Sequence, residues 1–176
     1  MRNIKKAESL KRFGARLRQI RETAEISQEQ IQYATGITQS HLSMIESGRL
    51  NTGLSHIAAL AEFFGLEEFQ LLQYADPVPA SDILKKNVAR YLKKNGIDPS
   101  LFLKKSLALT LRTKVIPSKF LSTPRYTKEI ADLLEQKFGV AFTTSAISQA
   151  LENLRKEGLV EKLATDNKSK FQYRKK

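Results

Sequence analysis

The sequence predicts a mainly α-helical protein, with five short helices in its first 75 residues and a basic α+β domain after them. Three observations lead to this prediction. Apolar residues recur at helical spacing up to residue 75, two prolines at 77 and 79 then interrupt the chain, and the charge changes there. Residues 1–75 carry nine Lys and Arg against eight Asp and Glu (net +1), whereas residues 76–176 carry twenty-one against ten (net +11). We therefore expect two domains, 1–75 and 82–176, joined by a linker at 76–81.

Composition excludes several classes of protein. Cys is absent and only two His occur, so we expect neither disulfides nor a structural zinc site. No apolar run approaches the ~20 residues of a membrane span, and residues 1–6 lack the apolar core of a signal peptide. The total charge of +12 instead favours a polyanion, either nucleic acid or an acidic membrane surface.

Local signals place the five helices of the first domain. Ser27, with Gln30 three residues later, forms a capping box that begins a helix at 28–34. Gly36 suits the left-handed conformation that ends this helix, and Thr38 caps a third helix that runs through Ser47. Apolar spacing predicts the remaining helices at 11–23, 54–64 and 67–74.

The second domain is less regular. Ser81 is expected to cap a basic helix that ends at Lys94, and Asp98 followed by Pro99 to begin another that runs to about Arg112. A proline-containing segment follows at 114–124. We then expect two further helices, at 127–138 and 144–156, and a hairpin from residue 159 onward, where apolar residues alternate.

One segment carries a resemblance to a known family. Residues 26–49 read ISQEQIQYATGITQSHLSMIESGR, followed by the helical run HIAALAEFFGL at 56–66. This pattern resembles the helix-turn-helix of the phage repressor/Cro (Xre) family over roughly residues 10–75. It departs from the family at Thr52 and Gly53, where the fourth helix lacks a side-chain cap. The apolar positions that hold the two helices together are Ile31, Ala34, Ile37, Leu42 and Ile45.

The resemblance implies a DNA site on the third helix, whose start enters the major groove in this docking mode. The outward face near that start carries four candidates for base contacts, Gln39, Ser40, Ser43 and Met44. A Gln side chain pairs with an adenine edge, Ser with several bases, and an apolar group with the thymine methyl. The resemblance further implies that Glu46 is a structural acid, and it places phosphate contacts at Gln28, Thr38, Arg49 and Asn51.

The segment 125–176 resembles a winged helix, with 144–160 similar to a recognition helix and the first wing strand. Its buried stripe would be Ile147, Leu151 and Leu154. The residues expected to contact DNA are Ser145, Ser148 and Gln149 on the helix and Lys168, Lys170 and Arg174 on the wing. Glu152 on the same face would either read a cytosine amino group or, if misplaced, repel phosphates. A purely structural or dimerising role of this domain stays open, because fold does not fix function.

These observations predict a sequence-specific, DNA-binding transcriptional regulator of a bacterium or mobile element, cytoplasmic and associated with the nucleoid. We expect double-stranded DNA and a second copy of the chain as partners, and no membrane, cofactor, metal or evident small-molecule ligand. The alternative is an antitoxin-type autoregulator whose second domain binds a protein. Enzyme activity is not expected, since Asp98, Asp132 and Asp166 lack metal-ligand spacing.

Overall fold

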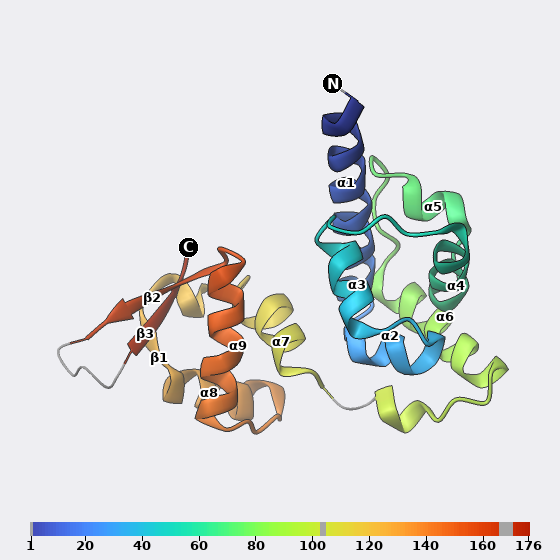
Figure 1. Ribbon diagram of the computed structural model, residues 1–176. Helices are drawn as coiled ribbons and strands as arrows, with labels where there is room; N and C mark the ends of the chain where they lie inside the picture. Colours follow the sequence, from blue (N-terminus) through green and yellow to red (C-terminus); the bar gives the residue numbers. More distant parts are fainter. Residues whose placement is uncertain (1, 103–104, 166–170) are drawn as a thin grey trace. The chain divides into compact units, whose positions relative to one another are not determined.

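The computed structural model describes residues 2–102, 105–165 and 171–176. The chain is mainly helical, with a small antiparallel sheet near its end, and divides into two compact units, Met1–Lys104 and Lys105–Lys176 (Figure 1). No helix in the described ranges is long and apolar enough to cross a membrane.

The described part of the first unit is built of helices, and the local signals around α2 (Gln28–Thr35) and α4 (Leu54–Phe64) are those expected from the sequence. The Ser27 hydroxyl accepts the Gln30 backbone N–H, while the Gln30 side chain accepts that of Ser27. Gly36 follows α2 in the left-handed conformation, with φ of 76°. Gly53 precedes α4 without a side-chain cap, as expected. The helices are α1 (Arg2–Thr23), α2 (Gln28–Thr35), α3 (Gln39–Glu46), α4 (Leu54–Phe64), α5 (Glu68–Leu72) and α6 (Ser81–Lys94), followed by a 3-10 helix at Pro99–Phe102.

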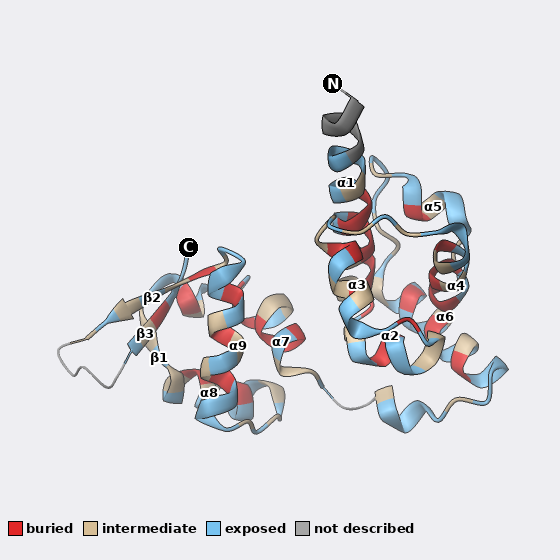
Figure 2. Cartoon of the chain, in the orientation of Figure 1, coloured by how far each residue is buried: buried red, intermediate tan, exposed pale blue. Residues whose placement is uncertain are grey.

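The core of this unit lies where the inner faces of the helices meet (Figure 2). Four of the five apolar positions predicted to hold α2 and α3 together are buried, which confirms their assignment, and Ala34 is half-buried. Helix α1 approaches α3 so closely at Gly14 that a Cβ atom there would collide with the carbonyl oxygen of Ile45. The largest fully buried side chains here include Leu17, Ile20, Ile31, Leu42, Ile45, Leu60, Phe63, Phe64 and Leu84.

Helix α6 belongs to the first unit, contrary to the predicted boundary at 76–81. Leu84, Val88 and Leu92 line its buried face and join the same core as α4. The Asn87 amide donates to the carbonyl oxygens of Phe64 (3.1 Å) and Gly65 (3.2 Å), which caps the end of α4. The prolines do end a helix, but the chain then folds back, so the change in charge marks no structural boundary. The division between units falls after Lys104.

The segment that crosses the predicted linker is tied down by Arg16. Arg16 is 6% exposed, and its guanidinium donates to the carbonyl oxygens of Asp76 (2.6 Å) and Pro77 (3.4 Å). Two predicted caps in this region also need correction. Ser81 is the first residue of α6, with Ala80 in the cap position and no side-chain cap. Asp98 binds the N–H and hydroxyl of Ser100, but only a single 3-10 turn follows it.

The predicted helix from Asp98 to Arg112 is therefore wrong. A new start occurs at Ser106, whose hydroxyl accepts the Leu109 N–H and begins α7 (Leu107–Thr110). The helix then continues as a π-helical turn over Leu111–Val115. The second unit thus begins with a short, irregular helical segment, whereas the sequence predicted that these residues would form the end of a long helix.

The rest of the second unit combines two helices with three strands. A 3-10 turn (Lys119–Ser122) leads to β1 (Arg125–Tyr126), α8 (Thr127–Phe138), α9 (Thr144–Lys156), β2 (Val160–Ala164) and β3 (Phe171–Lys175). Strand order is β1-β3-β2, with both pairs antiparallel. The predicted helices and hairpin strands are confirmed, whereas the two-residue β1 was not predicted. The expected hairpin tip lies mostly outside the described residues.

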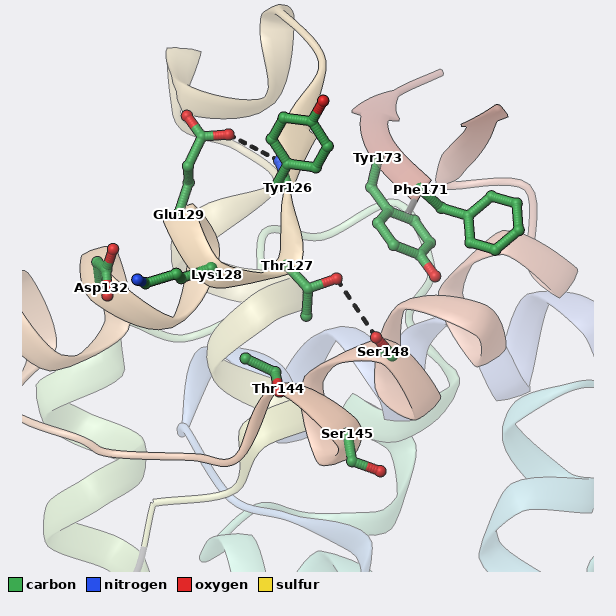
Figure 3. A pocket seen from close by; sticks show the side chains of 10 residues that line it. All are labelled: Tyr126, Thr127, Lys128, Glu129, Asp132, Thr144, Ser145, Ser148, Phe171 and Tyr173. Carbon is green, nitrogen blue, oxygen red and sulfur yellow. Dashed lines mark hydrogen bonds between the residues drawn. The ribbon is translucent and has the colours of Figure 1, made fainter. Parts of the chain in front are cut away.

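A separate core holds this unit together. The predicted buried stripe of α9 is confirmed, since Ile147 and Leu151 are fully covered and Leu154 nearly so. These side chains pack with others from α8, the sheet and the π-helical turn. Thr127 of α8 and Ser148 of α9 are also joined by a hydrogen bond of 3.3 Å between their hydroxyls (Figure 3).

Candidate nucleic-acid interface

Helices α2 and α3 form a helix-turn-helix with a well-capped second helix. Thr38 precedes α3 in extended conformation, and its hydroxyl accepts the His41 N–H at 3.3 Å. Leu42 and Ile45 are turned into the core. The opposite face of α3, beginning with Gln39, consequently faces away from the core.

The four predicted base contacts lie on this outer face. Gln39 and Ser40 are exposed in the first turn of α3, and Ser43 is half-buried one turn later. Met44 is 38% exposed although its side chain is apolar. The structure therefore brings an amide, two hydroxyls and a thioether to one solvent-facing surface. The first three groups can form hydrogen bonds, and the thioether side chain can make apolar contacts.

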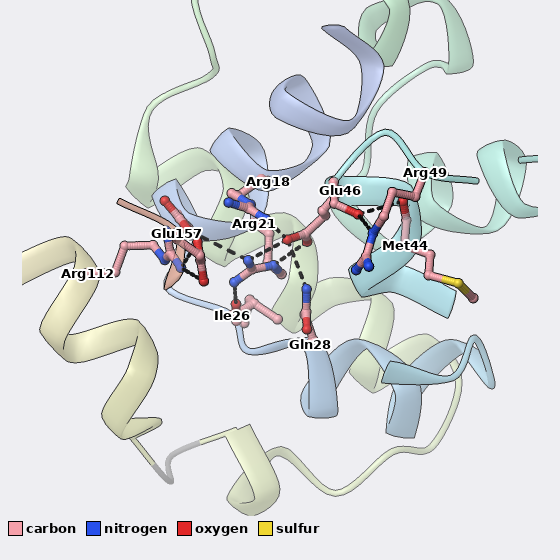
Figure 4. Close-up of polar contacts among 11 residues, drawn as sticks. Arg18, Arg21, Ile26, Gln28, Met44, Glu46, Arg49, Arg112 and Glu157 are labelled. Carbon is pink, nitrogen blue, oxygen red and sulfur yellow. Dashed lines mark hydrogen bonds and ion pairs between the residues drawn. The ribbon is translucent and has the colours of Figure 1, made fainter. Parts of the chain in front are cut away.

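A buried carboxylate anchors α3 to α1 (Figure 4). Glu46 is 4% exposed and accepts from Arg21 Nε at 2.6 Å and a second Arg21 nitrogen at 2.8 Å. Arg18 Nε lies 3.3 Å from the same carboxylate. This pairing satisfies a charge that would otherwise be costly to bury, and it confirms the prediction that Glu46 is structural.

Gln28 takes part in the same cluster. Its Nε2 donates to Glu46 Oε2 at 3.0 Å, and the side chain is half-buried. The predicted phosphate-contacting residue at the start of α2 thus has an amide donor engaged within the protein. Its structural link to Glu46 was not expected from the sequence.

The other three predicted phosphate contacts are exposed around α3. Thr38 lies at its start, while Arg49 and Asn51 lie in the loop after it. Arg49 Nε donates to the Ser47 hydroxyl at 2.8 Å, which orients the guanidinium. A hydroxyl therefore lies at the start of α3, and a guanidinium and an amide lie after its end.

One side chain at this surface was missed by the sequence reasoning. Gln32 of α2 is exposed, and its Oε1 accepts the backbone N–H of Gln39 at 2.6 Å. The carbonyl of Ala34, also on α2, accepts a hydrogen bond from the Tyr91 hydroxyl of α6 at 3.3 Å. No local pattern identifies Gln32, because the bond depends on how the turn brings two residues together.

In the second unit, α9 presents only part of the predicted surface. Ser145 and Gln149 are exposed, but Ser148 is half-buried and bonded to Thr127. Ser148 also lies against the buried Tyr173, whose pKa is raised chiefly by burial and next by the charge of Glu152. Ser148 is therefore only partly exposed, because α8 and β3 cover part of it.

The charged residues beside α9 are mostly paired. Glu152 accepts from Arg155 at 2.6 Å, and this hydrogen bond holds the Glu152 pKa below its usual range. The predicted wing cation Arg174 donates its Nε to Glu161 at 2.6 Å, directly across the β2–β3 pair. Lys168 and Lys170 lie outside the described residues. The expected repulsion from Glu152 is thus reduced by Arg155.

A hollow of about 710 Å³ opens between the start of α9, the start of α8 and the sheet (Figure 3). Hydroxyl groups of Thr127, Thr144, Ser145 and Ser148 line it, together with Phe171 of β3. The sequence had suggested no pocket in this domain. The hollow adjoins the exposed start of α9, so it belongs to the same candidate surface.

The comparisons with known proteins agree with this geometry in the first unit. Residues 12–71 match the family model described as a helix-turn-helix domain. No curated protein and no solved structure matched the chain. The matched range contains α2, the turn and α3, together with α4 and parts of α1 and α5. The protein therefore contains a helix-turn-helix domain of the DNA-binding class.

Proposed function

We propose that this protein is a sequence-specific regulator of transcription that binds double-stranded DNA. The observation that carries the proposal is the outer face of α3, where Gln39, Ser40, Ser43 and Met44 stand opposite a well-packed core. An α-helix fits the major groove, where each base pair presents a distinct pattern of donors and acceptors. Gln39 would pair with an adenine edge, and Met44 would contact a thymine methyl.

Backbone contacts would set the register of α3 in the groove. Thr38 at its start and Arg49 and Asn51 after it are exposed and suited to phosphate oxygens. The order of helices and these positions support membership of the phage repressor/Cro (Xre) family. In this proposal, occupancy of an operator blocks or guides the polymerase of a bacterial or mobile-element host, and no catalytic step is involved.

The second unit is proposed to be a winged helix that contacts the same DNA. Its order β1–α8–α9–β2–β3, with the hairpin following the exposed α9, supports this assignment. Residues 105–176 carry fifteen Lys and Arg against seven Asp and Glu, a net charge of +8. Ser145 and Gln149 are its available polar contacts on α9, whereas Arg174 would have to exchange Glu161 for a phosphate.

A single helix-turn-helix reads few bases, so a second contact is needed for tight and specific binding. We propose that the chain acts as a homodimer on half-sites about 34 Å apart, or ~10 base pairs. The second unit would extend each half-site by flanking contacts. The protein would then act on the nucleoid in the cytoplasm.

Selection of bound sites from random duplexes, followed by footprinting and sedimentation, tests the proposal. We expect a selected sequence with two related half-sites, protection beyond them, and a dimer in solution. Binding without enrichment of any sequence would contradict the proposed function. A monomer that protects one asymmetric site would contradict the dimer alone, and protection confined to the half-sites would contradict contact by the second unit.

A further inference from the structure

The amide of Gln32 has its acceptor engaged and its donors free. Gln32 Oε1 accepts the backbone N–H of Gln39 at 2.6 Å, across the turn between α2 and α3. A backbone N–H can only donate, so the atom that faces it must be the carbonyl oxygen of the amide. The NH₂ group therefore points elsewhere, and no acceptor for it is found among the described residues. The side chain is exposed to solvent.

This hydrogen bond fixes the beginning of α3. The first N–H groups of a helix have no partner within the helix itself. Thr38 satisfies the N–H of His41, and Gln32 satisfies that of Gln39. Two side chains, one in the turn and one from α2, thus hold the start of the helix on which the base-reading residues lie.

Gln28 and Gln32 of α2 differ in exposure and in whether the amide NH₂ group already has an acceptor, and a phosphate contact requires an exposed donor. Gln28 is half-buried, and its Nε2 donates to the buried Glu46 at 3.0 Å. Gln32 is exposed next to Gln39, with both N–H bonds of its amide unoccupied in the described part of the chain. Gln side chains are common ligands of phosphate oxygens in protein–DNA complexes. The contact expected from the start of α2 is therefore better supplied one turn later.

We infer that Gln32 binds a DNA backbone phosphate through its NH₂ group while its carbonyl oxygen holds the N–H of Gln39. The inference rests on the proposed function of α3 and deepens it. Gln32 is both a phosphate ligand and a positioning residue, because one amide connects the backbone contact to the base-reading residue. Loss of this amide weakens binding to every duplex, since a phosphate carries no sequence information.

Two variants separate these roles. Gln32→Met keeps the length of the side chain and removes both hydrogen bonds. Gln32→Glu keeps an oxygen for the Gln39 N–H but replaces the donor by an anionic oxygen that repels phosphate. Gln73→Glu, at an exposed position after α5, makes the same change of charge and serves as the control. Both positions are on the surface, so thermal unfolding is expected to stay near that of the wild type.

We expect Gln32→Met to bind both selected and random duplexes about tenfold to a hundredfold more weakly, the usual effect of losing a hydrogen bond to a charged group. Gln32→Glu should lose at least as much, and Gln73→Glu much less. Duplexes with one phosphate at a time replaced by neutral methylphosphonate supply the decisive readout. Wild type should be sensitive at one phosphate beside the start of α3, and Gln32→Met should be insensitive there.

Each outcome decides between specific claims. If Gln32→Met binds more weakly but keeps the full methylphosphonate penalty, Gln32 is only structural and the phosphate contact is refuted. Unchanged affinity in both Gln32 variants overturns the inference while leaving the proposed function intact. A wild-type chain that prefers no duplex sequence overturns the proposed function and the inference together.

Discussion

Truncation of Leu84 should weaken the helix-turn-helix domain, although the residue lies beyond the matched range 12–71. Leu84 is fully buried on α6 and packs in the same core as α4. Replacing a buried Leu by Ala typically costs about 2–5 kcal/mol, because contacts are lost and a cavity remains. A domain is stable by only about 5–15 kcal/mol, so Leu84→Ala removes a large share of the total.

Amide hydrogen exchange in α4 of the full chain measures this effect. A loss of about 2 kcal/mol raises exchange through global opening roughly 30-fold, since each 1.4 kcal/mol corresponds to a factor of ten. The neighbouring Ile83 is 48% exposed on the same helix and provides a matched control as Ile83→Ala. If Leu84→Ala raises exchange in α4 no more than Ile83→Ala does, α6 is not part of the first unit and a boundary after Lys104 is wrong.

Three further predictions concern charge. Glu46→Gln should destabilise the first unit by about 3–5 kcal/mol in urea unfolding, because it removes the closer of the two carboxylates that pair with buried Arg21. An equal loss from Glu62→Gln, which breaks an exposed pair with Lys94, would contradict this. The log–log slope of affinity against salt should be steeper for the full chain than for residues 1–104, by roughly 0.9 per phosphate that the second unit neutralises; equal slopes would mean that this unit does not touch DNA. Because Arg155 lowers the Glu152 pKa, the stabilisation from this pair is present at neutral pH and is lost as pH falls through that lowered value. NMR titration of the Glu152 carboxyl in wild type and Arg155→Gln should therefore show a higher pKa in the variant, and an unchanged pKa would refute the pairing in solution.

Features that depend on local chemistry could be predicted from the sequence. Ser27, Gln30 and Gly36 define the ends of α2 through contacts within a few residues of one another, and the structure has each of them. The burial of Ile147 and Leu151 follows in the same way from helical spacing in α9. For such elements the information needed is contained in one short stretch of chain.

Features that depend on distant contacts could not be predicted. Two prolines and a change in charge suggested a boundary near residue 80, but Asn87 and Leu84 make their contacts with α4, about twenty residues earlier. Strand β1 is only two residues long and has no recognisable pattern before β3 pairs with it. Spacing alone also placed Ser148 outward and could not show that Thr127 and Tyr173 contact it and cover part of its surface.

The central claim is that α3 reads base sequence, and Gln39 tests it most directly. Gln39 is exposed at the start of α3, and its N–H is held by Gln32. Gln39→Ala should cost about 1–3 kcal/mol on the selected duplex, relax the preference at one base pair, and leave affinity for random DNA nearly unchanged. The measurement is the affinity of wild type and variant for the selected duplex, its single-base variants and random DNA at one salt concentration. Equal weakening on all of these duplexes, or none on any, would contradict the account.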